Sequence, residues 1–69
     1  MSRYYVKSAE RILEHITFVR YVIGCLARDA ELMPSETMKT HLGHLYNILG
    51  DTVMPKIEEL ITLLREAEG

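Results

Sequence analysis

The N-terminal part of the chain carries an apolar repeat that is too wide for a single helix-to-helix contact. Spacings alternate between four and three residues, as in a coiled-coil seam, along Tyr5, Ala9, Ile12, Ile16, Val19, Ile23 and Leu26. Other apolar residues border this seam on both sides, including Val6, Leu13, Val22 and Phe18. The apolar arc therefore covers more than half of the helix circumference, whereas a helix of a small monomer needs only one apolar stripe. We predict a helix over about residues 3–28 that packs partly against its own chain and partly against another chain.

A turn is predicted over residues 29–34. Met33 precedes Pro34, and the proline ring disfavours helical backbone at the residue before it. A second helix then begins, either with Pro34 at its first position or with Ser35 as its N-cap. This helix is expected to extend to about residue 67.

The second helix contains a fault between residues 50 and 55. Pro55 has no backbone donor and its ring presses on the carbonyl of Asp51, while Gly50 is typical of a helix end. At the same place the apolar stripe rotates by roughly 50° on a wheel of 3.6 residues per turn. A kink there would realign the stripe and turn Lys56 outward.

These patterns predict an all-α fold with a single domain over residues 1–69. The expected architecture is an antiparallel helical hairpin with a kinked second arm, or three helices if Gly50 ends one of them. A chain of 69 residues supplies only about 3–5 kcal/mol of net stability from its own core. The single Cys25 excludes an internal disulfide. We therefore expect a homodimer, in which two hairpins form a four-helix bundle.

Charge is unevenly distributed along the chain. Residues 1–28 contain five basic and two acidic residues, a net charge of +3, and residues 29–69 contain three basic and eight acidic residues, a net charge of −5. The hairpin should thus bring Lys7 close to Glu58 and Glu59. A dimer that binds RNA or DNA is an alternative function, but Glu10 and Glu14 interrupt the basic residues, and phosphate binding needs a net positive surface. We do not expect a nucleic-acid partner.

Residues that could support chemistry are few. His41 and His44 lie three apart on one helical face, and the hairpin would bring His41 within about one turn of Cys25, so a small metal-binding bundle is a further alternative. Two histidines at this spacing are more typical of a polar surface, and a free cysteine is usually buried as a small hydrophobe. We predict no catalytic residue, no metal and no cofactor.

The remaining signal predicts a non-enzymatic protein–protein interaction module, acting as an inhibitor, anti-activator or adaptor. The dimer or core seam is assigned to Ile12, Ile16, Val19, Val22, Ile23 and Leu26. A separate strip that is rich in aromatic residues and arginine, the residues favoured at binding hot spots, is assigned to a second protein: Arg11, Phe18, Tyr21 and Arg28. No apolar run is long enough to span a membrane, and a single cysteine suits a reducing compartment, so we expect a cytoplasmic protein.

Overall fold

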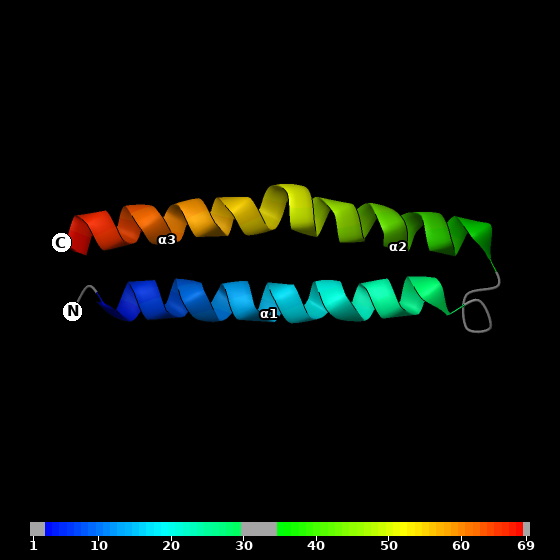
Figure 1. Ribbon diagram of the computed structural model, residues 1–69, viewed down its shortest axis with the longest axis horizontal. Coiled ribbons are helices and arrows are strands. Elements are labelled where there is room, and N and C mark those ends of the chain that lie inside the picture. Colours follow the sequence, from blue (N-terminus) through cyan, green and yellow to red (C-terminus); the bar gives the residue numbers. More distant parts are fainter. Residues whose placement is uncertain (1–2, 30–34, 69) are drawn as a thin grey trace.

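Two helical arms lie side by side and run in opposite directions (Figure 1). The computed structural model describes residues 3–29 and 35–68. The first arm is one helix, α1 (Arg3–Arg28). The second arm contains α2 (Glu36–Ile48), the π-helix η1 (Leu49–Val53) and α3 (Met54–Glu68), which follow one another without a gap. The predicted helical hairpin with a kinked second arm is confirmed, and the described ranges contain no strand.

The second arm begins at a capped turn. Ser35 has extended backbone angles, and its hydroxyl accepts a hydrogen bond from the amide of Met38 at 3.3 Å. Glu36 follows in the first turn, where its negative charge suits the positive end of the helix dipole. Ser35 is therefore the N-cap, and the alternative start at Pro34 lies outside the described residues, as does most of the predicted turn.

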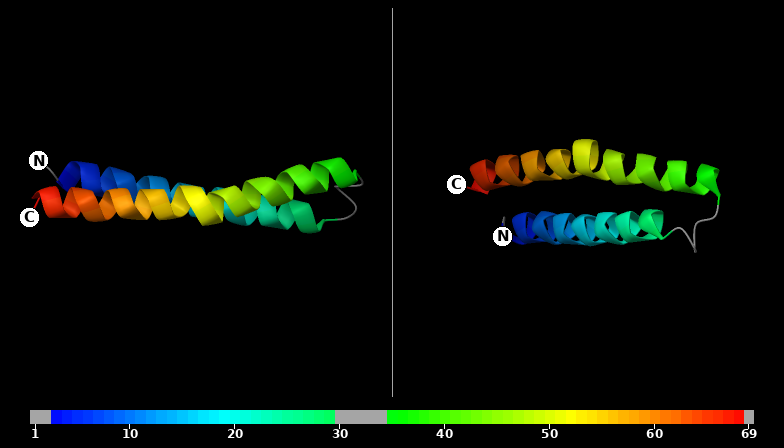
Figure 2. Two further views of the ribbon diagram at one scale, coloured as in Figure 1. Left: turned by 90° about the horizontal axis from the view of Figure 1, so that it is seen from above. Right: turned by 45° about the vertical axis from the view of Figure 1, so that its right-hand side comes forward.

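The fault in the second arm is a kink and not a break. Gly50 lies inside η1, and the amide of Met54 donates to the carbonyl of Leu49, five residues earlier. This widened turn ends two residues before Pro55, which has no amide hydrogen and whose ring needs space near the preceding turn. Figure 1 shows the arm bulging at η1, and the views of Figure 2 show it continuing on both sides. The possibility of three separate helices is thus excluded for the described residues.

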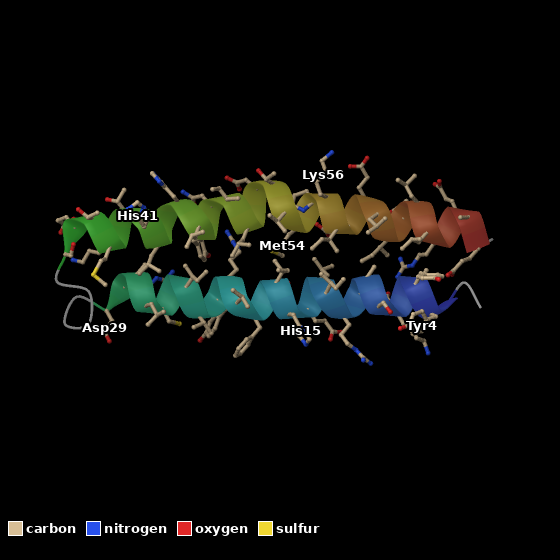
Figure 3. The ribbon with its side chains drawn as sticks, turned by 180° about the vertical axis from the view of Figure 1, so that it is seen from behind. Tyr4, His15, Asp29, His41, Met54 and Lys56 are labelled. Atoms are coloured by element: carbon tan, nitrogen blue, oxygen red, sulfur yellow. The ribbon has the colours of Figure 1, made fainter. Side chains whose placement is uncertain are left out.

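The two arms share a narrow seam. The buried and half-buried positions of α1 again alternate by three and four residues, along Val6, Ala9, Leu13, Ile16, Arg20, Ile23 and Ala27. From the second arm the corresponding positions are Leu42, Tyr46, Leu49, Met54, Ile57, Ile61 and Leu64. Figure 3 shows Met54 between the arms, whereas Lys56 points away from α1, as the kink predicted. Three of the described residues are buried, Val6, Ala9 and Ile61, and all lie near the open end of the hairpin, where α1 begins and α3 ends.

One charged side chain lies within this seam. Arg20 is half-buried, and its Nε donates a hydrogen bond to the carbonyl of Tyr46 at 3.0 Å. The guanidinium carbon also stands 3.8 Å from the centre of the Tyr46 ring, a cation–π contact. The Tyr46 ring also packs closely on the backbone of Gly24 in α1. A Cβ at Gly24 would lie only 3.0 Å from the ring. Arg20 therefore links the two arms near the point where the second arm changes from α2 to η1.

Candidate interaction surface

Large apolar side chains remain exposed on α1 beside the seam. Their relative exposures are 62% for Tyr5, 51% for Ile12 and 44% for Val19. These residues are seven apart, so they form one stripe along the helix. The stripe is the part of the predicted seam that the second arm does not cover.

The second arm has exposed apolar residues of its own. Met38 and Leu45 of α2 are 46% and 47% exposed, and Leu60 and Leu63 of α3 are 47% and 55% exposed. Around their helices from the centre of the seam, Met38, Leu45 and Leu60 lie at about 50–80° and Leu63 lies at about 140°, always in the same rotational sense. They form a second stripe along the second arm.

An ion pair shows that the two stripes lie on the same side of the hairpin. Glu10 of α1 and Arg65 of α3 meet at 2.6 Å across the seam. On a helical wheel, Glu10 lies about 100° from the inward-facing Ala9 in the direction in which the chain advances, and Arg65 lies about 40° from Ile61 in the same direction. We call this the forward side of each helix. Because Glu10 and Arg65 meet, the forward sides of the two helices lie on the same side of the hairpin. The apolar stripes lie on the backward sides, which must then coincide too. We call the seven residues together the apolar face: Tyr5, Ile12, Val19, Met38, Leu45, Leu60 and Leu63.

The opposite side of the hairpin is polar. A shallow cavity of about 250 Å³ there is lined by Glu10, Leu13, Glu58, Ile61, Thr62 and Arg65. A second cavity of about 190 Å³ lies nearer the turn and is lined by Gly24, Ala27, Arg28, Gly43, Tyr46 and Asn47. In the ion pair the acidic residue, Glu10, belongs to α1 and the basic residue, Arg65, belongs to α3. The sequence had predicted the reverse arrangement, with the basic Lys7 of α1 close to the acidic Glu58 and Glu59 of α3. The hairpin is therefore a layer of two helices with one apolar and one polar side.

The residues predicted for the seam divide between two environments. Ile16, Ile23 and Leu26 are half-buried in the hairpin, whereas Ile12, Val19 and Val22 are exposed. Four inward positions of α1 were not predicted to belong to the seam: Val6, Leu13, Arg20 and Ala27. A repeat through Val6, Leu13, Arg20 and Ala27 is present in the sequence, but the arginine makes it look like a surface pattern.

The residues predicted for a second protein are all exposed, and they spread over about 100° of the outer and polar sides of α1. Tyr21 and Arg28 border a small depression on the polar side, together with Gly24, Cys25 and Tyr46. Phe18 and Arg11 lie about 160° or more from the centre of the seam, on the outer surface of α1. Phe18 and Tyr21 have exposures of 66% and 68%, so neither is used by packing within the chain.

The candidate metal ligands were also located. Cys25 is a free, exposed thiol, so the expectation that it is buried is wrong. His41 and His44 are exposed on α2. Within residues 3–29 and 35–68, no group of three His, Cys, Asp or Glu side chains is close enough together to hold a metal ion.

Comparison of the chain with protein-family models, curated proteins and solved structures gave no significant match. Over its described residues, the structure contains no helix with both the length and the apolar character needed to cross a membrane.

Proposed function

We propose that this chain is a non-enzymatic protein–protein interaction module. It self-associates through the apolar face, most simply as a two-fold dimer that forms a four-helix bundle, and it docks on another protein as an inhibitor, anti-activator or adaptor. The observation that supports this proposal is the exposure of seven large apolar residues along one side of the hairpin. Monomeric proteins rarely expose a continuous apolar patch of more than a few hundred Å².

The surface area of the hairpin supports a second copy as the occupant of this face. Its accessible surface is 5460 Å², whereas a compact monomer of 8.0 kDa has about 4,450 Å². The excess of about 1,000 Å² per chain matches the roughly 800 Å² that each partner buries in a standard protein interface. The hairpin extends 50 × 16 × 11 Å along its principal axes, so it is a flat layer that a second copy can cover face to face.

The small core leads to the same expectation. Only Val6, Ala9 and Ile61 are buried among the described residues. A single hairpin therefore gains little from apolar burial, and a partner that binds only the folded chain would add to its stability by mass action. Folding and association should be coupled.

Sedimentation equilibrium and thermal melts over a range of micromolar chain concentrations test the self-association. The expected results are a mass of twice 8.0 kDa and a melting temperature that rises with concentration. Ile12→Asp places a charge on the apolar face and should abolish both, whereas the matched variant Thr17→Asp, at an exposed position on the polar side of the same helix, should abolish neither. A monomer with a concentration-independent melting temperature would refute the proposal.

Docking on a second protein is tested with a partner isolated by pull-down from the native host. If the aromatic residues of α1 form the contact, Phe18→Ala or Tyr21→Ala should weaken binding by about 2 kcal/mol, roughly thirtyfold, and spare the helical content. Both side chains are about two-thirds exposed, so their removal leaves the hairpin packing intact. Undiminished binding by both variants would show that the partner does not contact these aromatic residues, and it would indicate the acidic residues of α3 as the contact surface.

A further inference from the structure

We infer that η1 sets the rotation of α3 so that its outer apolar stripe joins the apolar face, which makes this face continuous over both halves of the second arm. The inference deepens the proposed self-association and rests on it. The partner is a second copy of this chain, which must cover α2 and α3 together. Three observations support this role for η1.

The first observation is a shift of one residue in the inward positions of the second arm. Leu42 and Leu49 face α1 and are seven residues apart, and Ile57 and Leu64 also face α1 and are seven apart. Leu49 and Ile57, on the two sides of η1, are eight apart. Because an α-helix in such a seam repeats every seven residues, η1 adds one residue and rotates α3 by about 100°.

The second observation concerns what α3 would present without this shift. An uninterrupted α-helix that continued from Leu49 would turn Lys56, Leu60 and Leu63 inward. The side chains one position earlier would then occupy the apolar side, and they are polar: Glu59, Thr62 and Glu66. Ile57 and Ile61 would lie on the polar side of the hairpin. The apolar face would end near the middle of the second arm, and Lys56 would be placed in the seam.

The third observation identifies what holds η1 in place. In a regular α-helix the carbonyl of Tyr46 accepts from the amide of Gly50, four residues later. Here this carbonyl accepts from the amide of Leu49, three residues later, and also from Nε of Arg20 of α1 at 3.0 Å. A Cβ at Gly50 would lie 2.5 Å from Nε and Nη2 of Arg20, so the absence of a side chain at this position lets the guanidinium reach the carbonyl. Arg20 thus stabilises the widened turn from the opposite helix.

Changes of one residue in length test the inference, because they alter the rotation of α3 by a known amount. All variants carry Pro55→Ala, since a proline inside a regular helix would itself be strongly destabilising. Deletion of the exposed Thr52 removes the extra residue and leaves Ile57, Ile61 and Leu64 facing α1 in an unbroken helix. Insertion of one alanine after Thr52 rotates α3 by a further 100° or so.

The dimer dissociation constant from sedimentation equilibrium should separate the two length variants. The deletion should keep it within about threefold of the Pro55→Ala parent, and the insertion should raise it by at least about tenfold, or 1.4 kcal/mol. Circular dichroism checks that each variant is helical. Loss of the dimer in a helical deletion variant, or an undiminished dimer in the insertion variant, would overturn the inference.

Thiol reactivity tests the same point in an arm of natural length. In a Cys25→Ser background, which removes the exposed native thiol, cysteine is introduced by Ile12→Cys, Leu63→Cys or Thr62→Cys. The thiols at positions 12 and 63 should become less reactive as the chain concentration rises, and the thiol at 62, on the polar side, should not. Protection at 12 without protection at 63 would place α3 outside the interface and refute the role of η1. Absence of protection at all three positions would instead refute the self-association itself.

Discussion

Replacing Arg20 by alanine tests whether one guanidinium holds the two arms together at η1. The change removes a half-buried hydrogen bond of 3.0 Å to the Tyr46 carbonyl and a cation–π contact of 3.8 Å with the Tyr46 ring. Hydrogen bonds made by charged groups contribute about 1.5–3 kcal/mol. A cation–π contact adds about 0.5–1 kcal/mol. Because the site is only partly buried, water replaces some of the lost hydrogen bonding, and we expect Arg20→Ala to lower the free energy of unfolding by about 2–3 kcal/mol.

Urea denaturation followed by far-UV circular dichroism measures this loss, with every variant at the same chain concentration because folding is expected to be coupled to association. Arg28→Ala removes an exposed arginine from the same helix and should change the free energy of unfolding by less than about 0.5 kcal/mol. A double-mutant cycle with Tyr46→Leu, which keeps the carbonyl and removes the ring, separates the cation–π contact from the hydrogen bond. A loss below about 0.5 kcal/mol for Arg20→Ala would refute the view that Arg20 stabilises this site.

Other substitutions probe backbone space and the two environments of α1. Gly43→Ala should raise the free energy of unfolding by about 0.8–1 kcal/mol, because a Cβ there would meet no atom within 4 Å and alanine favours the helix. Gly50→Ala should lower it, since its Cβ would lie 2.5 Å from Arg20, and this loss should shrink in an Arg20→Ala background; additive losses in the urea cycle would contradict the clash. Val19→Asp, on the apolar face, should remove the concentration dependence of the melting temperature, whereas Ile23→Asp, half-buried between the arms, should reduce the helical signal at every concentration. Identical behaviour of these last two variants would show that the apolar face and the seam are not separate surfaces.

The two-arm fold follows from simple sequence signals, but the form of the fault does not. Pro34 and Pro55 indicate where the helices change, and the shift of the apolar stripe near Gly50 indicates that the second arm is not straight. A helix break and a π-turn both make room for the missing donor of Pro55, so the sequence pattern does not distinguish them. The contact that favours the π-turn comes from Arg20, which lies 26 positions before its acceptor residue, Tyr46, in the chain.

The apolar surface was predictable in extent but not in its division between packing and exposure. Two seams run along α1, and both contain Ala9, Ile16 and Ile23. A helical wheel shows that the two seams are adjacent. The seam that faces the second arm contains Arg20, and a charged residue is normally expected at the surface. The carbonyl and the ring of Tyr46 make an arginine suitable there. The choice of seam therefore depends on a tertiary hydrogen bond that no periodicity reveals.

The position of the buried residues has a mechanical consequence. Val6, Ala9 and Ile61 lie near the open end of the hairpin, where α1 begins and α3 ends, whereas no described residue in the half nearer the turn is buried. A force that pulls the two ends apart meets the best-packed contacts first. Once these contacts separate, the remaining seam offers less resistance, so a single hairpin held in an optical trap should open in one abrupt step. Gradual unzipping at a lower force would show that the strongest contacts lie closer to the turn.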